Sequence, residues 1–224
     1  MPLSLTATRE LLARLGLSPK RFLGQNFLVD SGVIARAVER LALAPGDLVV
    51  EIGPGRGALT DPLVAAGVRV VAVERDRQLA ERLRGRYADV DRVRVITCDI
   101  RRFRWPREPY RVVGNVPFGV TSDILDALLD DPDKGPTRAD LLVQAEVAHK
   151  RAAAPPTTLR SAAWAPWWTF TVGDHVPRQA FRPVPAVDAA WLTIRQRTPA
   201  VLPTTLAPSF RDHLRPLWSG AHEG

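Results

Sequence analysis

The sequence predicts an α/β fold in which a mostly parallel β-sheet is covered by helices on both faces. Short, almost continuously apolar runs alternate with amphipathic segments along the chain, and such runs are typical of parallel strands buried on both sides. Glycine, acidic or amide residues follow several of these runs, beginning with LVVEIG at 48–53. The 224 residues are enough for one sizeable core and a small appendage.

Hydrophobic spacing and turn residues place the individual elements. Strands are expected at 48–53, 68–73, 93–97, 110–114, 141–144, 164–172 and 189–195. The last two are expected to form an antiparallel pair. Helices are expected at 33–41, 58–66, 77–87 and 124–129. Segment 152–163 has little periodicity and is predicted to be a mobile loop, and the tail after Arg197 has room for one short helix.

The composition favours a cytoplasmic protein with a polyanionic partner. The formal net charge is +7 at pH 7, and clustered cations bind phosphates by releasing counterions, although an arginine-rich bias also arises from compositional drift. No apolar run reaches the roughly 18 to 20 residues of a membrane span. The single Cys98 and the absence of zinc-type Cys/His spacing predict neither a disulfide nor a metal.

A glycine-rich turn follows the first strand in EIGPGRGALT at 51–60. Gly53 and Gly55 let the backbone turn tightly and approach a ligand, and Glu51 stands at the end of the strand. We expect these three residues to bind a cofactor. With Ala58 and Glu74, the same glycines also satisfy a dinucleotide-binding pattern, so a nicotinamide cofactor is an alternative, as is simple tight packing.

Polar residues also follow the next strands, namely Glu74, Asp99 and Asn115. The carboxyl ends of parallel strands meet at one rim, where ligands of such folds bind. Glu74 can accept hydrogen bonds from a ribose diol and Asp99 from an adenine amine, which fits an adenosine ligand without phosphates. The purine would lie between Ile52, Arg75 and Ile100. Asp76, in contrast, is expected to cap the helix that begins at Arg77.

The turn GNVPF at 114–118 has the groups needed to methylate an exocyclic amine. Such a nitrogen is a poor nucleophile until it becomes pyramidal, and acceptors aimed at its hydrogens favour that shape. The Asn115 side-chain oxygen and the Val116 carbonyl are the expected acceptors, Pro117 fixes the turn, and Phe118 offers a stacking face for an extruded base. The alternative is an ordinary turn with a core phenylalanine.

Several motifs together resemble the ribosomal RNA adenine N6-methyltransferases, which include the Erm macrolide-resistance methyltransferases and the dimethyladenosine transferases. The resemblance covers about three quarters of the chain. The motifs are GQNFLVD (24–30), EIGPGRGALT (51–60), VERD (73–76), CDI (98–100), GNVPF (114–118), LLVQAEVAHK (141–150) and VPRQAFRPVPAVDAAWLTI (176–194).

This resemblance implies a Rossmann-like class I methyltransferase fold with a mostly parallel seven-stranded sheet, and S-adenosylmethionine as cofactor. By the resemblance, Gln25, Asn26 and Leu28 would close over the cofactor, while Gly53 and Gly55 would pass beneath it. Glu74 would hold the ribose, and Asp99 and Ile100 the adenine. Asn115 and Phe118 would receive the target base.

Basic residues beside this predicted site are candidates for RNA binding. In IRRFRWPR at 100–107, arginines interleave with Phe103 and Trp105, although each cation alone is more simply a surface residue and Trp105 is equally compatible with the core. Trp164, Trp167 and Trp168 are expected to be strand and core residues. The expected RNA-binding residues are Lys20, Arg21, Arg101, Arg102, Arg104, Arg107, Lys150, Arg151 and Arg160.

The expected organisation is an amino-terminal segment with a cofactor-closing turn (1–30), a methyltransferase domain (31–198) and a short helical segment (199–224). Family members usually carry a helical domain in the last position, and the segment here is expected to be a shortened or a degenerate form of it. WAPWWTF and the following residues resemble the resistance enzymes, which predicts 23S ribosomal RNA before subunit assembly as the partner of a monomer.

Three alternatives remain open at this point. The chain can be a small-subunit dimethyladenosine transferase, a nicotinamide-dependent oxidoreductase, or an RNA-binding relative with reduced catalysis.

Overall fold

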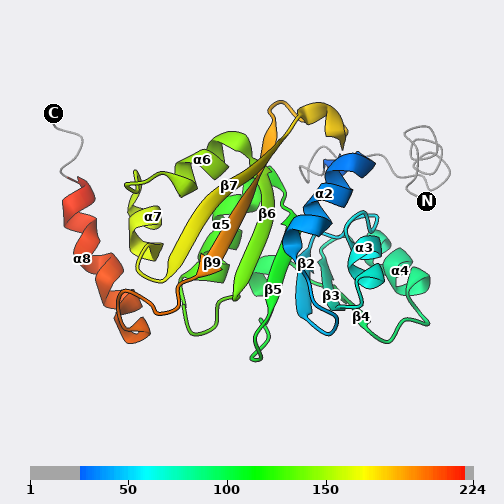
Figure 1. The fold of residues 1–224 in the computed structure, drawn as a ribbon, viewed down its shortest axis with the longest axis horizontal. Coiled ribbons are helices and arrows are strands. Elements are labelled where there is room, and N and C mark those ends of the chain that lie inside the picture. Colours follow the sequence, from blue (N-terminus) through cyan, green and yellow to red (C-terminus); the bar gives the residue numbers. More distant parts are fainter. Residues whose placement is uncertain (1–25, 220–224) are drawn as a thin grey trace.

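The computed structural model describes residues 26–219 and contains the predicted seven-stranded sheet (Figure 1). The strands are β2 (Leu48–Ile52), β3 (Arg69–Glu74), β4 (Val93–Thr97), β5 (Arg111–Asn115), β6 (Arg138–Gln144), β7 (Trp168–Val176) and β9 (Ala189–Gln196). Their order is β4-β3-β2-β5-β6-β9-β7. The strands β2 to β6 are parallel, and β9 runs antiparallel to both β6 and β7. The predicted antiparallel pair is confirmed.

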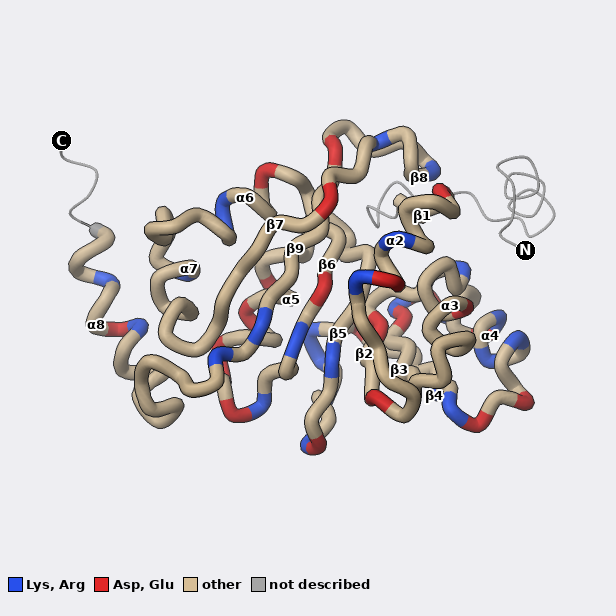
Figure 2. Tube along the Cα trace, in the orientation of Figure 1, with Lys and Arg blue, Asp and Glu red and all other residues tan. Residues whose placement is uncertain are grey.

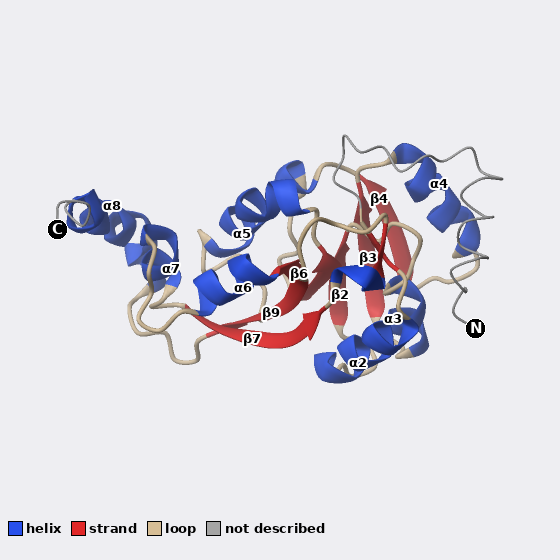
Figure 3. Cartoon of the chain, turned by 90° about the horizontal axis from the view of Figure 1, so that it is seen from above, coloured by secondary structure: helices blue, strands red, loops and turns tan. Residues whose placement is uncertain are grey.

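Helices cover both faces of the sheet (Figures 1 and 3). One face carries α2 (Ser31–Leu41), α3 (Thr60–Ala65) and α4 (Arg77–Arg86), and the other carries α5 (Thr121–Leu129), α6 (Ala145–Ala152) and α7 (Leu159–Trp164). Right-handed crossovers explain this division, because the chain moves outward from β2 to β4 and then returns in the opposite direction through β5 and β6.

The strands are apolar because each one contributes to a hydrophobic core on both faces. In β2, Val50 packs into one core with Ile124 of α5, whereas Val49 packs into the second with Leu63 of α3. Side chains alternate between faces along a strand, so two cores require a nearly continuous apolar run. This confirms the predicted fold class and places the strand ends between two rigid layers.

The segment between α6 and β7 differs from the prediction. A loop is expected at 152–163 and a strand from residue 164, but α7 occupies 159–164 and β7 begins at Trp168. Thr158 caps α7 by accepting a hydrogen bond from the Ser161 backbone, and the Arg151 guanidinium donates to the side chains of both residues. These polar contacts stabilise a helix that has no clear apolar stripe.

The carboxyl-terminal part forms a 3₁₀ turn, η5 (Thr204–Leu206), and the single expected helix, α8 (Ala207–Ser219). The Phe210 ring meets the Trp167 ring edge-on at 5.8 Å, and the Trp167 indole donates to the Leu202 oxygen. Trp164, Trp167 and Trp168 are all buried, as expected for core residues. Trp164, however, ends a helix and is not in a strand.

Two short strands connect distant parts of the chain beside the sheet. β1 (Phe27–Leu28) pairs antiparallel with β8 (Phe181–Arg182), which follows the 3₁₀ turn η4 (Arg178–Ala180). This ladder holds Phe27 next to the glycine turn after β2, since a Cβ on Gly55 would approach the Phe27 ring to 3.0 Å. No helix of residues 26–219 is long and apolar enough to cross a membrane.

Candidate active site

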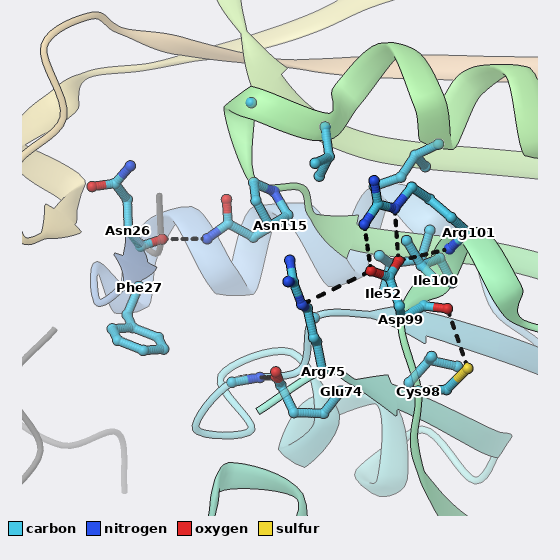
Figure 4. Close-up of a pocket in the computed structure, with 17 residues that line it drawn as sticks. Asn26, Phe27, Ile52, Glu74, Arg75, Cys98, Asp99, Ile100, Arg101 and Asn115 are labelled. Carbon is cyan, nitrogen blue, oxygen red and sulfur yellow. Dashed lines mark hydrogen bonds and ion pairs between the residues drawn. The ribbon is translucent and has the colours of Figure 1, made fainter. Parts of the chain in front are cut away.

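A cavity of about 340 Å³ opens at the carboxyl ends of the parallel strands (Figure 4). It lies where β2 separates strands that continue in opposite directions, which is the usual ligand position in open α/β sheets. Of the residues predicted from sequence, it is lined by Asn26, Ile52, Gly53, Gly55, Glu74, Arg75, Asp99, Ile100, Arg101, Asn115 and Pro117. The strand-end residues therefore meet in one site.

The floor of the cavity is the glycine turn after β2. Gly53 and Gly55 have φ angles of +64° and +57°, which residues with a Cβ rarely adopt. A Cβ on Gly53 would have only the Asn115 backbone oxygen within 4 Å, at 3.6 Å, and both residues border the cavity. The turn thus lets a ligand lie directly on the backbone.

Glu74 sits at the end of β3 with its carboxylate held by backbone amides. Its Oε2 accepts from the Gly55 N–H at 3.0 Å and its Oε1 from the Asp76 N–H at 2.8 Å. Burial raises the pKa of Glu74 above its ordinary value, while these two bonds oppose the shift. Each carboxylate oxygen accepts two hydrogen bonds, so Glu74 keeps acceptor capacity toward the cavity for a diol.

Asp99 follows β4 and is held by Arg101. Its Oδ1 accepts from the Arg101 backbone N–H at 3.1 Å and from Nε at 3.0 Å, and its Oδ2 accepts from the Arg101 side chain at 2.6 Å. These bonds lower the pKa of Asp99 to about 2. Arg75 Nε lies 3.8 Å from Oδ2. Because Oδ1 already has two donors, Oδ2 is the oxygen left to accept from an amine.

Asn115 projects from the end of β5 toward the same cavity as Glu74 and Asp99 (Figure 4). Its Nδ2 donates to the Asn26 backbone oxygen at 2.6 Å. A carbonyl cannot donate, so the amide nitrogen must face Asn26, and the side-chain oxygen is left to accept from a ligand. Asp76, meanwhile, caps α4 as predicted, accepting from the N–H groups of Gln78 and Leu79.

Three predicted site residues do not line the cavity because they pack into the cores. Leu28 is buried in the second hydrophobic core, and Val116 is buried in the first, where its N–H donates to the Leu142 oxygen. Phe118, at the start of the 3₁₀ turn η3 (Phe118–Val120), packs against the second core instead of facing the cavity. Packing around the turn directs this ring, and the sequence carries no signal for that packing.

Glu51 also lies behind the cavity. It is 1% exposed and accepts a hydrogen bond from the Thr60 hydroxyl at 2.6 Å, and burial raises its pKa to about 8. Its contact joins the end of β2 to the first turn of α3, so it supports the glycine turn from below. Glu51 therefore does not line this cavity, and its contact with a cofactor stays a prediction.

The predicted RNA-binding residues fall into separate groups. Arg101 is held by Asp99, and Arg160 pairs with Asp126 at 3.0 Å. Arg151 is buried at 8% exposure and lies over the Trp164 ring, so it is not an exposed cation as predicted. The exposed group is Arg102, Arg104, Arg107 and Lys150. Gln25, Lys20 and Arg21 lie outside the described residues.

Sequence reasoning missed several residues that complete the cavity wall, namely Phe27, Val73, Cys98, Gly119, Val120 and Ile124. Cys98 directly precedes Asp99 at a strand end, so its position was available from the pattern. Gly119, Val120 and Ile124 follow the NVPF turn into α5, and only the path of that turn shows their direction. Within residues 26–219, no three His, Cys, Asp or Glu side chains gather as a metal site.

Comparison with known proteins agrees with this geometry. The crystal structure of the 23S rRNA methyltransferase ErmE superposes with a TM-score of 0.78 and 30% identity, covering 89% of this chain and 81% of that one. The fold is therefore that of a Rossmann-like methyltransferase. A model of the ribosomal RNA adenine dimethylase family matches residues 16–217, and the chain belongs to that family.

Two relatives show the same relationship. An rRNA adenine N-6-methyltransferase of Corynebacterium diphtheriae is 38% identical over 201 residues, which are 90% of this chain and 78% of that protein. The mycinamicin-resistance protein MyrB of Micromonospora griseorubida is 39% identical over 202 residues, which are 90% of this chain and 64% of that protein. The first relative is named as an rRNA adenine N-6-methyltransferase, and this chain is an enzyme of that class.

Proposed function

We propose that this chain transfers the methyl group of S-adenosylmethionine to N6 of one unpaired adenine in 23S ribosomal RNA, and thereby confers macrolide, lincosamide and streptogramin B resistance. The observation that carries the proposal is the convergence of Glu74, Asp99 and Asn115 on one cavity at the strand ends. The first two supply acceptors for an adenosine, and the third supplies an acceptor for an amine.

The residues present fit S-adenosylmethionine. Glu74 is placed to accept from the ribose hydroxyls, Asp99 Oδ2 from the adenine amine, and Ile52, Arg75 and Ile100 to enclose the purine. The Gly55 N–H donates to Glu74, so it is not free for a pyrophosphate, which argues against a nicotinamide dinucleotide. When bound, the sulfonium supplies an electrophilic methyl group whose transfer discharges the sulfur.

The protein's own contribution to the chemistry is orientation of the target amine. Asn26 fixes the Asn115 amide so that its oxygen faces the cavity, and the Val116 carbonyl is the expected second acceptor. Hydrogen bonds from the amine to these oxygens favour a pyramidal nitrogen whose lone pair points at the methyl group. Pro117 lines the cavity and fixes this turn. After attack the positively charged nitrogen gives up a proton to solvent, and no strong base is needed.

The choice of RNA rests on the relatives. ErmE is named as a 23S rRNA methyltransferase and MyrB as a resistance protein, and both resemble this chain over about nine tenths of its length. We extend that target to this chain and place the enzyme in the cytoplasm as a monomer acting before full subunit assembly. The exposed arginines Arg102, Arg104 and Arg107, which follow the cavity-lining Arg101 along the chain, supply the charge for phosphate contacts.

Transfer of tritiated methyl from S-adenosylmethionine to protein-free RNA tests the proposal. We expect label in in-vitro transcribed 23S RNA, released on digestion as N6-methyladenosine, and none in 16S RNA. Label in 16S RNA alone would identify a small-subunit enzyme instead. Cofactor binding by calorimetry without transfer to either RNA would favour a binding protein without catalysis, and binding of a nicotinamide cofactor instead would overturn the site assignment.

A further inference from the structure

A second hollow of about 550 Å³ lies beside the cofactor cavity and shares Cys98 with it. It is formed on the face of β3 and β4 that looks toward α5. The connection from β4 to β5 contains only the 3₁₀ turn η2 (Ile100–Arg102), so no described helix covers this part of the sheet. We call this hollow the β4 groove. It is lined by Leu48, Arg69, Val70, Val71, Asp91, Arg92, Arg94, Ile96, Cys98, Arg102, Phe103, Arg104, Pro106 and Glu108.

The floor of the β4 groove is apolar and includes one aromatic ring. Val71 is paired in register with Arg94, and Ile96 is the next side chain of β4 on the same face. Phe103 lines the groove, and the Trp105 ring meets it edge-on at 5.0 Å. Trp105 in turn stacks on Tyr110 at 5.8 Å. The Phe103 ring is thereby held in place from behind.

The rim of the β4 groove is cationic. Arg92, Arg94, Arg102 and Arg104 are exposed, and their guanidinium groups make no hydrogen bond or ion pair with any of residues 26–219. The fifth arginine, Arg69, is already paired with Glu108 at 2.8 Å. Among the described lining residues this leaves Asp91 as the only acid to oppose four arginines. Figure 2 shows basic and acidic positions along the trace at this end of the sheet.

We propose that the β4 groove binds an unpaired segment of the substrate RNA. The four arginines at the rim can bind phosphates, and a base can stack on the Phe103 ring in the apolar floor. Proteins bind single-stranded nucleic acid through this combination of cations and aromatic rings. Cys98 lines both hollows, so the groove adjoins the catalytic cavity. A second copy of this chain fits less well, because its net charge of +7 would add repulsion. The inference rests on the proposed function.

The test variant carries two substitutions in the groove, Arg94→Gln and Arg104→Gln. The matched control carries the single substitution Arg195→Gln. Arg195 is also exposed, but its backbone pairs in register with Arg138 at the amino end of β6, on the rim opposite the site. In methyl-transfer assays with 23S RNA transcripts, we expect the double variant to raise the KM for RNA about tenfold or more, with kcat and the Kd for S-adenosylmethionine unchanged. The control should match the wild type.

Binding of a short fluorescein-labelled oligouridylate, followed by anisotropy at several salt concentrations, identifies the contact chemically. Removing one arginine that meets a phosphate should reduce the slope of log K against log salt by about 0.7 for a single strand. Phe103→Leu keeps the floor apolar but removes the stacking face, so it should weaken oligouridylate binding roughly tenfold and leave the salt slope unchanged. An RNA duplex of the same length should compete poorly.

The outcomes separate the groove from the enzyme's function. If the wild type methylates 23S RNA and the groove variants match it in KM and salt slope, the groove proposal is overturned while the function stands. If the wild type binds oligouridylate but methylates no RNA, the proposed function fails and the groove stands as an RNA site. Hydrogen exchange of residues 92–104 without RNA tests whether protein covers the groove. Protection that increases with protein concentration would show that a second copy covers it, and protection that does not depend on protein concentration would show that the chain itself covers it. Either result contradicts the proposal.

Discussion

The Asn115 amide nitrogen lies 2.6 Å from the Asn26 backbone oxygen, and this contact fixes the direction of the side chain at the centre of the site. Asn26 comes from the segment that β1 anchors to β8, whereas Asn115 ends β5. Asn26 and Asn115 are far apart in the sequence and meet only in the folded protein. A segment near the amino terminus therefore orients a side chain at the end of β5. The acceptor oxygen of Asn115 is thereby preset before RNA arrives.

Substitution of Asn115 should affect turnover and not cofactor binding. Asn115→Ala removes the acceptor, and Asn115→Asp places a carboxylate against the Asn26 oxygen, which repels it. We expect both to reduce kcat about 100-fold or more, with the Kd for S-adenosylmethionine within about threefold of the wild type. Calorimetry and single-turnover methyl transfer measure the two quantities. Wild-type kcat in Asn115→Ala would remove this residue from the chemistry.

The Asp99 assignment is tested by changing the partner atom on the ligand. S-adenosylhomocysteine offers an amine to Asp99 Oδ2, whereas S-inosylhomocysteine presents an oxygen there. We expect the wild type to prefer the adenosyl compound by about tenfold or more. Asp99→Asn should reduce or reverse this preference, since an amide nitrogen can donate to the inosine oxygen. A preference that survives unchanged in Asp99→Asn would show that Asp99 does not meet the purine edge.

Stability of the cofactor-free protein should depend on pH through Glu51. Burial raises its pKa from 4.5 to about 8 in the folded state, so the folded protein binds more protons than the unfolded chain between these values. The Glu51 contribution is therefore complete below about pH 4.5 and is lost as pH rises to about 8. Glu51→Gln, which keeps an acceptor for the Thr60 hydroxyl, should flatten this part of the profile. Urea unfolding at several pH values measures it, and parallel profiles for the two proteins would contradict the assignment.

Gly114 should be intolerant of any side chain. A Cβ there would lie 2.6 Å from the Ile52 backbone oxygen of the neighbouring strand β2. Gly114→Ala should lower the free energy of unfolding by about 1–3 kcal/mol. Gly85→Ala is the matched control, because it is exposed in α4 with nothing within 4 Å, and it should raise the free energy by about 0.5–1 kcal/mol. If the two substitutions changed the free energy of unfolding equally, β2 and β5 would be able to move apart at Gly114 without cost.

The sequence predicted the elements that depend on repeated local patterns. Each parallel strand was placed to within a few residues, because two cores demand a continuous apolar run, and the residues that follow those runs, Glu74, Asp99 and Asn115, necessarily meet at one rim. The six residues of α7 were missed because capping by Thr158 and contacts from Arg151 stabilise it, and neither leaves a periodic signal.

Side-chain direction within the site was less predictable. Glu51 and Phe118 both belong to the motifs from which the site was inferred, yet one lies beneath the glycine turn and the other packs on the second core. Motif position gives the location of the backbone, whereas packing around it decides which way each side chain points. The β4 groove likewise depends on the absence of a described helix between β4 and β5, a consequence of topology.

Mapping of methylated adenines on ribosomal RNA tests the central claim most directly. The RNA would be taken from cells producing this protein and from cells producing Asn115→Ala, and examined by primer extension and mass spectrometry. A new N6-methyladenine at one unpaired position of 23S RNA, present only with the wild-type chain, is the predicted result. Unmodified 23S RNA in cells that contain the folded protein, or methyl groups on small-subunit RNA alone, would contradict it.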